Sequence, residues 1–397
     1  MLNFIKKYEL NPTLLKSIIV NFIIYSSFVI ALPVIPVYMQ HKGIAYSEMG
    51  YTFLLFGLVC AIVKIIVGYL SDKFGRKLFM LLGIIGFGIS TQCFLLCNDF
   101  ISFAVVRIAQ GVFYGVFLSA MCGYISDFKD KYTSITLYRI SNSVGIIIGF
   151  ALGGYFSSVS VTAPFYAVFA LTIIVFIFTM FFIKNVRRAE SLPVKDNFTF
   201  SEFFTNLLSV FKNKKFSFYL VIFLLMELAF CSLELALPIF GSKINASSSY
   251  VSIAFSAYFL VFSLSQIPLN KIIKNKNILN ALALFTFFSM SPFLLLINSK
   301  TGIMIVIALS ILGATMGTVF TQCNVLACVA APEDQQGIYF AVLEAIMPVS
   351  TVIMSLIVGL VSQFTDVLVV FVIDLVLVLI TLLMLFACII SKRFKRK

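Results

Sequence analysis

Two glutamates lie in a stretch of the sequence that is otherwise apolar. Glu227 and Glu234 both fall within residues 217–240, seven residues apart, so a continuous helix would carry them on one face. A carboxyl group in hydrocarbon is costly unless it holds a proton, and a group that exchanges protons near neutral pH needs that property. We therefore predict that these acids bind protons or substrate. Alternatively, one of them forms a structural ion pair with Lys64 or Arg107.

Two basic residues also lie within apolar stretches. An arginine in the middle of a membrane span is costly in lipid, so we expect Arg107 to face the protein interior or a wet cavity. Alternatively, Arg107 is close enough to the start of its span for its side chain to reach the headgroups. Lys64 would give such a cavity a second positive charge, and Glu344 would place a further acid along it. The sequence assigns no role to Asp374.

The composition requires a membrane protein with many spans. The 397 residues are 61% hydrophobic and 11% charged, with a mean hydropathy of +1.08. A soluble domain of this length could not bury so much apolar surface. We predict an all-α membrane protein with twelve transmembrane helices, over residues 14–38, 49–70, 78–97, 101–125, 135–157, 162–183, 217–240, 250–270, 278–297, 302–330, 337–362 and 366–390.

The basic residues predict how the chain is threaded. Most of the 29 Lys and Arg residues lie in the termini and in one alternating set of loops, which is the positive-inside pattern. We expect a multi-pass protein of the cytoplasmic (inner) membrane with both termini in the cytoplasm. The net charge of +13 follows from this pattern and does not indicate nucleic-acid binding. The long polar segment 184–216 would be a cytoplasmic linker between an N-terminal half, 1–183, and a C-terminal half, 217–397.

Short sequence matches relate the two halves. The tripeptide Ala-Leu-Pro at 31–33, in the first predicted span, recurs at 236–238 in the seventh. The Gly-x-x-x-Gly pattern at 111–115, in the fourth span, recurs at 313–317 in the tenth. Such duplication is typical of transporters whose substrate site lies between two repeats near the bilayer midplane. We therefore predict two pseudo-symmetric halves of six helices each.

A charged turn separates the second and third predicted spans. Residues 68–77 read Gly-Tyr-Leu-Ser-Asp-Lys-Phe-Gly-Arg-Lys, so one acid, Asp72, lies among basic residues at a membrane edge. Gly75 permits the tight turn, and Gly68 lets the helix end approach a neighbour. Asp72 would interact favourably with the positive end of a nearby helix. A basic loop that only fixes topology is the alternative interpretation.

Small residues form a stripe along the fifth predicted span. Gly145, Gly149 and Gly153 follow one another at four-residue spacing, and Gly154 comes next. A stripe of this kind lets two helices approach closely. Helix packing alone would explain it.

The charged turn and Arg107 together resemble motifs of the major facilitator superfamily. The superfamily has a turn similar to residues 68–77 after its second helix, and a sequence similar to the Arg-x-x-Gln-Gly that begins at Arg107. The resemblance covers nearly the whole chain. It implies twelve helices and a role for Arg107 in proton coupling. It also implies a conformational latch at the turn, formed by Gly68, Asp72, Gly75 and Arg76.

Two further motifs resemble those of exporters within that superfamily. The stripe Gly145, Gly149, Gly153 and Gly154 is similar to the pattern that marks its antiporters, although Phe150 stands where the family expects proline. The setting of Glu234 is similar to that of the span-7 acid in small bacterial multidrug exporters of the fluoroquinolone-pumping type. The resemblance thus implies an antiporter.

We therefore predict a proton-coupled efflux transporter that exports small organic molecules or drugs across the cytoplasmic membrane. Its partners would be a small-molecule substrate, protons and the lipid bilayer, and we expect a monomer. The proton gradient would supply the energy, so no cofactor is expected. No nucleophile–base set or phosphate loop indicates an enzyme, and the eight cysteines lack ligand-spaced partners that would indicate a metal.

Other functions remain open at this point. A dedicated exporter of an anionic metabolite, such as a siderophore, would use Lys64 and Arg107 as counter-charges. A sugar or metabolite importer is less favoured, because the glycine stripe suits an exporter and the sequence lacks tryptophan for a sugar site. A receptor or scaffold would not need acids inside its spans.

The predicted topology can be tested by labelling single cysteines in a cysteine-free background. A cysteine at Ser191 should react only from the cytoplasm, and a cysteine at His41 only from outside, because the Lys and Arg residues place the intervening loops. Membrane-impermeant maleimide on intact cells and on permeabilised cells gives the measurement. Labelling of the Ser191 position from outside would show that the number of spans is wrong.

Overall fold

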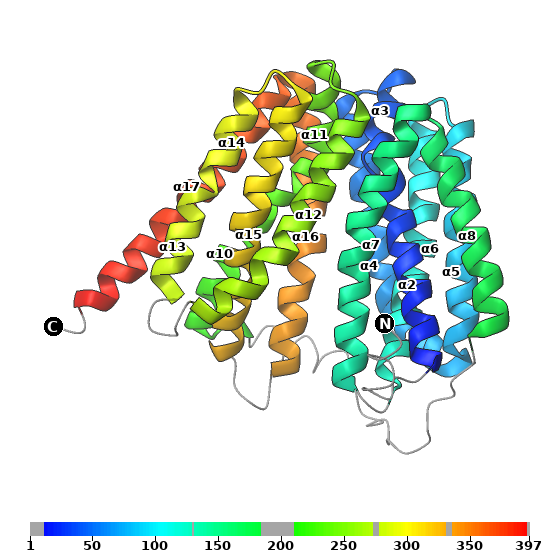
Figure 1. Cartoon of the computed structure of the whole chain (residues 1–397), viewed down its shortest axis with the longest axis horizontal. Coiled ribbons are helices and arrows are strands. Elements are labelled where there is room, and N and C mark those ends of the chain that lie inside the picture. The colour runs from blue at the N-terminus through cyan, green and yellow to red at the C-terminus, as the bar shows by residue number, and fades with distance from the viewer. Residues whose placement is uncertain (1–11, 129–130, 184–209, 273–277, 331–335, 395–397) are drawn as a thin grey trace. The chain divides into compact units, whose positions relative to one another are not determined.

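The computed structural model describes residues 12–128, 131–183, 210–272, 278–330 and 336–394, and within these helices it leaves some side chains undescribed, including those of Asp72 and Glu344. The described residues form helices joined by short loops, with no strand among them (Figure 1). Twelve of the helical stretches are long and apolar enough to cross a membrane. The predicted all-α membrane fold with twelve transmembrane helices is confirmed.

The chain divides into two compact units, Met1–Ala189 and Glu190–Lys397. The helices of the first unit are α2 (Pro12–Ala31), α3 (Val34–His41), α4 (Tyr46–Phe74), α5 (Arg76–Cys93), the 3-10 turn η1 (Phe94–Leu96), α6 (Phe100–Ser126), α7 (Lys131–Val159) and α8 (Ala163–Phe182). Those of the second are α10 (Lys214–Cys231), α11 (Leu233–Lys243), α12 (Ser248–Ile272), α13 (Ile278–Phe288), α14 (Met290–Ile297), α15 (Gly302–Ala330), α16 (Gln336–Phe364) and α17 (Val367–Phe394). Most of the predicted linker, 184–209, lies outside the described residues, and α10 already begins within its last part.

Three of the twelve spans are interrupted near a proline. The first span consists of α2 and α3, the seventh of α10 and α11, and the ninth of α13 and α14. Proline has no N–H to donate to the carbonyl four residues earlier, and its ring crowds that carbonyl. Pro33 lies at the first interruption, whereas Pro238 and Pro292 follow the other two within α11 and α14. The repeated Ala-Leu-Pro tripeptide therefore accompanies an interrupted helix in both units.

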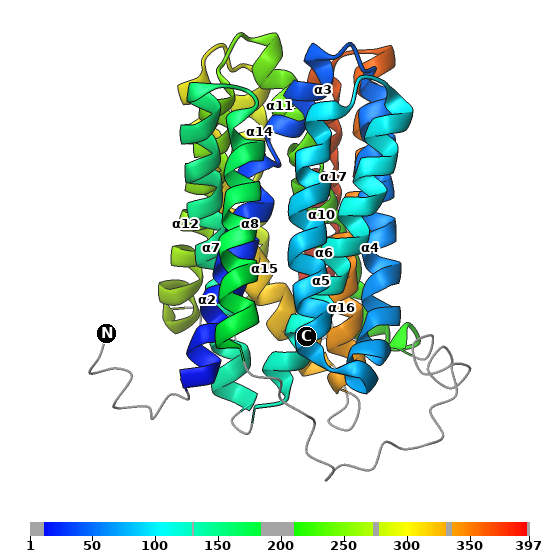
Figure 2. The ribbon, with the colours of Figure 1, turned by 90° about the vertical axis from the view of Figure 1, so that its right-hand side faces the viewer.

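The two units pair their helices in the same way. In the first unit α4 packs on α6, α2 on α7 and α8, and α5 on α6 and α8; Figure 2 shows α4, α5 and α6 side by side. In the second unit α12 packs on α15, α10 on α16 and α17, and the α13–α14 pair on α15 and α17. These are the equivalent spans in each half, so the pairing supports the internal repeat found in the sequence.

The tightest pairs in both units are made by the repeated glycines. A Cβ on Gly111 would lie 2.7 Å from the carbonyl oxygen of Phe56, so α6 touches the backbone of α4 there. A Cβ on Gly313 would overlap the carbonyl of Tyr258, which brings α15 equally close to α12. Hydrocarbon gives helices no hydrophobic reason to associate, so this close approach is what holds each pair together.

This packing predicts that Gly111→Ala and Gly313→Ala each destabilise their unit by about 1–3 kcal/mol, because the new methyl group meets backbone that cannot turn aside. Gly68→Ala is the matched control, since its Cβ would lie 3.4 Å from Oγ of Ser119, an ordinary contact. Unfolding followed in mixed detergent micelles would give the three free energies. Equal stability of all three variants would show that the helix contacts at Gly111 and Gly313 tolerate a side chain.

Candidate functional site

Arg107 lies inside the first unit, between two phenyl rings. Its side chain is 1% exposed. The central carbon of the guanidinium lies 4.3 Å from the ring centroid of Phe53 and 4.5 Å from that of Phe56, both on α4. A cation over an aromatic face gains about 0.5–2 kcal/mol, more when water is excluded. The two rings thus contribute to stabilising the buried charge.

A chain of hydrogen bonds fixes the same arginine. Its Nη1 donates to Oε1 of Gln110 at 2.8 Å, and Nε2 of Gln110 donates to Oγ1 of Thr91 on α5 at 3.0 Å. Thr91 in turn donates to the carbonyl of Phe87 at 2.8 Å. The planar guanidinium is therefore held in one orientation inside the first unit. Lys64, on α4, is partly exposed, and its carbonyl accepts a hydrogen bond from Ser119 of α6 at 2.8 Å.

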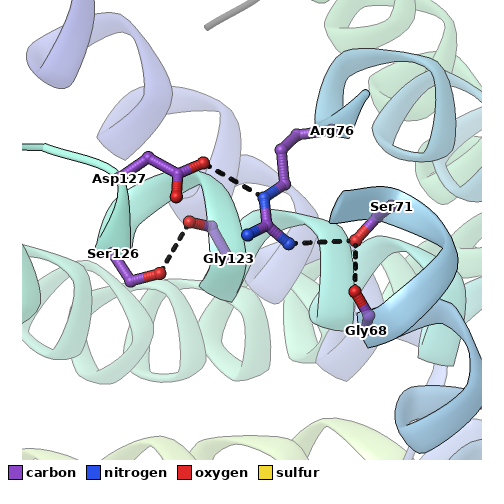
Figure 3. A network of polar contacts seen from close by, with 6 residues as sticks. All are labelled: Gly68, Ser71, Arg76, Gly123, Ser126 and Asp127. Atoms are coloured by element: carbon purple, nitrogen blue, oxygen red, sulfur yellow. Dashed lines mark hydrogen bonds and ion pairs between the residues drawn. The ribbon is translucent and has the colours of Figure 1, made fainter. Parts of the chain in front are cut away.

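The charged turn is organised around Arg76. α4 ends at Phe74, and Gly75 has a φ of 100°, a conformation that side chains disfavour, so the turn requires glycine. Nε of Arg76 donates to Oδ2 of Asp127 at 3.1 Å, and Nη1 donates to Oγ of Ser71 at 3.0 Å (Figure 3). Oγ of Ser71 in turn donates a hydrogen bond to the carbonyl oxygen of Gly68 at 3.1 Å.

Burial makes this ion pair unusual for a helix end. The side chains of Arg76 and Asp127 are only 10% and 13% exposed, and Figure 3 shows Gly123 beside the guanidinium. A Cβ on Gly123 would overlap that guanidinium, so the arginine lies flat against the backbone of α6. The pair ties the turn to the end of α6. Of the predicted latch residues, Gly68, Gly75 and Arg76 thus meet in one cluster, whereas the side chain of Asp72 lies outside the described residues.

Asp127 was not among the predicted site residues. The only sequence signal is an acid directly after the fourth span, in a loop that also contains Lys129, Asp130 and Lys131. That signal cannot say which of the nearby basic residues is the partner, because Arg76 is far away along the chain. The fold supplies the answer by placing α4 and α6 in contact.

The two glutamates of the seventh span have different surroundings. Glu227, on α10, is 3% exposed, and its Oε2 lies 3.8 Å from Sγ of Cys231. The hydroxyl of Thr351, on α16, lies 3.5 Å from the same sulfur. Glu234 lies in the first turn of α11 and is partly exposed. Because the helix is interrupted between the two acids, their seven-residue spacing no longer fixes a shared face. The side chain of the third predicted acid, Glu344, lies outside the described residues.

The glycine stripe is a helix–helix contact within the first unit. A Cβ on Gly145 would lie 2.8 Å from the carbonyl oxygen of Phe22, and one on Gly153 would lie 2.6 Å from that of Ile30. Gly149 and Gly154 are buried along the same helix. The stripe therefore brings α7 against the backbone of α2, as close packing requires.

These features define a class of protein before any comparison is made. Two repeated six-helix units, with interrupted spans and with charged side chains buried inside them, are the architecture of a polytopic membrane transporter. Charged residues inside membrane spans commonly mark substrate or proton pathways.

The chain belongs to the Major Facilitator Superfamily, whose profile matches residues 17–345 and 244–397. The quinolone resistance protein NorA of Staphylococcus aureus (strain MSSA476) is 26% identical over 302 residues, which span 74% of this chain and 76% of that protein. An uncharacterised MFS-type transporter of Methanocaldococcus jannaschii is 26% identical over 316 residues, or 77% of this chain and 79% of its own.

Solved structures share the fold. The nucleoside transporter NupG superimposes with a TM-score of 0.75 at 16% identity, covering 95% of this chain and 99% of that one. The human organic anion transporter MFSD10 (TETRAN) gives a TM-score of 0.59 at 17% identity, covering 95% and 100%. At these identities the likeness establishes the architecture alone.

The Arg76 cluster predicts that Asp127→Asn destabilises the first unit by about 1–3 kcal/mol, because a nearly buried guanidinium loses a charged partner. The same change at Asp366 is the matched control. Asp366 pairs with Lys243, but their side chains are 40% and 50% exposed, so its loss should cost about 0–1 kcal/mol. Unfolding in mixed micelles at pH 7 would measure both. Equal losses would show that burial of the Arg76 pair adds nothing.

The control pair also has a defined pH window. The Leu368 N–H and the Lys243 ammonium hold the pKa of Asp366 below its ordinary value of 3.8. A depressed pKa in the folded state contributes stability that is present at neutral pH and lost as the pH falls through the lowered value. The difference between wild type and Asp366→Asn should therefore disappear in strong acid.

Proposed function

We propose that the protein is a proton-coupled efflux transporter that exports small organic molecules, including drugs, across the cytoplasmic membrane. The observation that carries the proposal is the seventh span, where Glu234 lies partly exposed directly after a helix interruption. A carboxyl group at such a place can exchange a proton and change its surroundings when the helix moves. The similarity to NorA, a quinolone resistance protein, supports export of drug-like molecules.

The residues of the second unit would divide the work of proton exchange. Glu234 would be the carrier, because a proton has to reach the group from water and its side chain is partly exposed. Glu227 is buried, with its Oε2 3.8 Å from Sγ of Cys231, so a proton from water reaches it less readily than it reaches Glu234. Protons entering down their gradient at Glu234 would drive the substrate outward.

Arg107 would supply a fixed positive charge in the first unit. A guanidinium stays protonated under all working conditions, and here two rings and Gln110 also fix its direction. It would disfavour protonation of any acid that approaches it during the transport cycle. The latch at Gly68, Gly75 and Arg76 would change partners in that cycle, with Asp72 as a further participant.

The same arginine favours one alternative, a dedicated exporter of an anionic metabolite. The buried guanidinium of Arg107 would attract an incoming carboxylate or phosphate. A panel of cationic, neutral and anionic compounds, tested for export from cells with and without the protein, would separate the two functions. Export of anions alone would favour the metabolite exporter.

The proposal predicts that Glu234→Gln abolishes export driven by a pH gradient while substrate still binds. Glutamine keeps the shape and hydrogen-bonding capacity of the side chain but cannot release a proton. Glu234→Asp should retain part of the activity with an altered pH profile. Proteoliposomes with an imposed pH gradient and ethidium or a fluoroquinolone as substrate would give the rates, and detergent samples would give binding and proton release.

The matched control is Glu227→Gln, which removes the other acid of the same span. It should reduce transport less than Glu234→Gln does. Undiminished proton release from Glu234→Gln would move the coupling role to Glu227 or Glu344. Loss of binding only for the cationic substrate would make Glu234 a ligand for the substrate instead of the proton carrier.

A further inference from the structure

Asp374 is a third buried acid of the second unit, and neither the family motifs nor the proposed coupling uses it. It lies on α17 and is 0% exposed. Its Oδ2 is 2.7 Å from Oγ of Ser232, the residue at the interruption between α10 and α11. Its Oδ1 has no hydrogen-bond partner among the described residues. The acid therefore contacts the interruption between α10 and α11 at Ser232, called the joint below, in the span that carries Glu227 and Glu234.

Counting hydrogens around Ser232 distinguishes the two forms of this acid. The hydroxyl has one hydrogen, but its oxygen lies near two acceptors, Oδ2 of Asp374 and the carbonyl of Ala229, the latter at 3.1 Å. If Asp374 were ionised, the hydrogen would turn to the carboxylate and Ala229 would lose it. If Asp374 is protonated, its own O–H donates to Ser232, and Ser232 donates to Ala229. Only the protonated form provides a hydrogen for both contacts.

Among the described residues around Asp374, no positively charged side chain is shown to compensate an ionised carboxylate. Of the elements packed on α17, α13 and α14 carry no ionisable residue, and the described side chains of α16 include none. The ionisable residues of α10 and α11 are Lys214, Lys215, Tyr219, Glu227, Cys231, Glu234 and Lys243. Lys243 pairs with Asp366, and Lys214 and Lys215 are exposed at the start of α10. A buried charge with one hydroxyl as its partner is strongly unfavourable.

We propose that Asp374 binds a proton and, through Ser232, positions the interrupted seventh span. The inference rests on the proposed function only for its effect on transport, since the proton itself follows from the geometry. Loss of that proton would turn the Ser232 hydroxyl away from Ala229 and release a contact at the joint. Glu234 lies two residues beyond Ser232, so its position would change with the protonation of Asp374. Asp374 is thus a positioning residue that senses pH.

Infrared spectroscopy of the purified protein tests the proton directly, whatever the protein transports. A protonated carboxyl group has a C=O stretch that a carboxylate lacks. The spectrum of wild type minus that of Asp374→Asn at neutral pH should show this band, and Ser232→Ala should shift it, since the acid loses its acceptor. Asp366→Asn is the matched control and should leave the band unchanged, because that acid is an exposed carboxylate paired with Lys243. Absence of the band from the Asp374→Asn difference would overturn the proposal.

Exchange of ethidium across proteoliposomes without a pH gradient tests the positioning role. Asparagine can still donate to Ser232 but cannot ionise, so Asp374→Asn should keep its rate at alkaline pH where wild type loses activity. Asp374→Leu and Ser232→Ala should lower the rate at every pH, because both remove the contact. If Asp374→Asn lost its exchange rate at alkaline pH as wild type does, the positioning role would be refuted. If wild type exchanges no substrate at all, the proposed function fails, while the infrared result still decides the proton.

Discussion

Hydrocarbon offers no hydrogen bonds, so a polar group buried within a span of this protein gains its partners from the protein itself. In the first unit, phenyl faces and a Gln110–Thr91 chain serve Arg107. In the second, a thiol serves Glu227 and a hydroxyl serves Asp374. The partner of Asp374 is a neutral hydroxyl. A neutral partner lets an acid gain or lose its proton without leaving an opposite charge stranded, which a permanent ion pair would do.

Both units use one scaffold for different chemistry. Equivalent helices pair in each, and Gly111 and Gly313 make equivalent backbone contacts. Yet the first unit contains the buried guanidinium of Arg107, and the second contains the buried acids Glu227 and Asp374. Duplication therefore preserved the positions at which helices touch and left the polar residues free to diverge. Among the described residues, the spans thus bury an arginine in one half and acids in the other.

Hydropathy alone could predict the spans, because a bilayer imposes a length and an apolar composition on each of them. The sequence also marked Arg107, Glu227 and Glu234 as exceptional, since charge in an apolar run is conspicuous. It could not predict partners. Arg76 and Asp127 are 51 residues apart, and Ser232 and Asp374 are 142 apart, so only the packing of helices brings them together.

The interruption at Ser232 shows a second kind of limit. Pro238 signals a disturbed helix, but the break occurs several residues earlier, where a serine can bond to its own helix and to α17. A proline rule therefore locates the disturbance only to within about two turns. The shared face predicted for Glu227 and Glu234 assumed an unbroken helix between them. The side chains packed around the joint, which lie elsewhere in the sequence, decide where it forms.

The close helix contacts at Gly111 and Gly313 have a mechanical consequence. At these glycines α6 lies on the backbone of α4, and α15 lies on that of α12. No side chains therefore lie between the helices at these points, where they could otherwise slide or repack. Each pair is therefore expected to move as one rigid body, and bending of the seventh span is expected at the interruption between α10 and α11. Libraries of variants that aim to change the range of transported substrates should leave these close helix contacts intact. Substitutions around the interruption between α10 and α11 would instead alter how the seventh span bends.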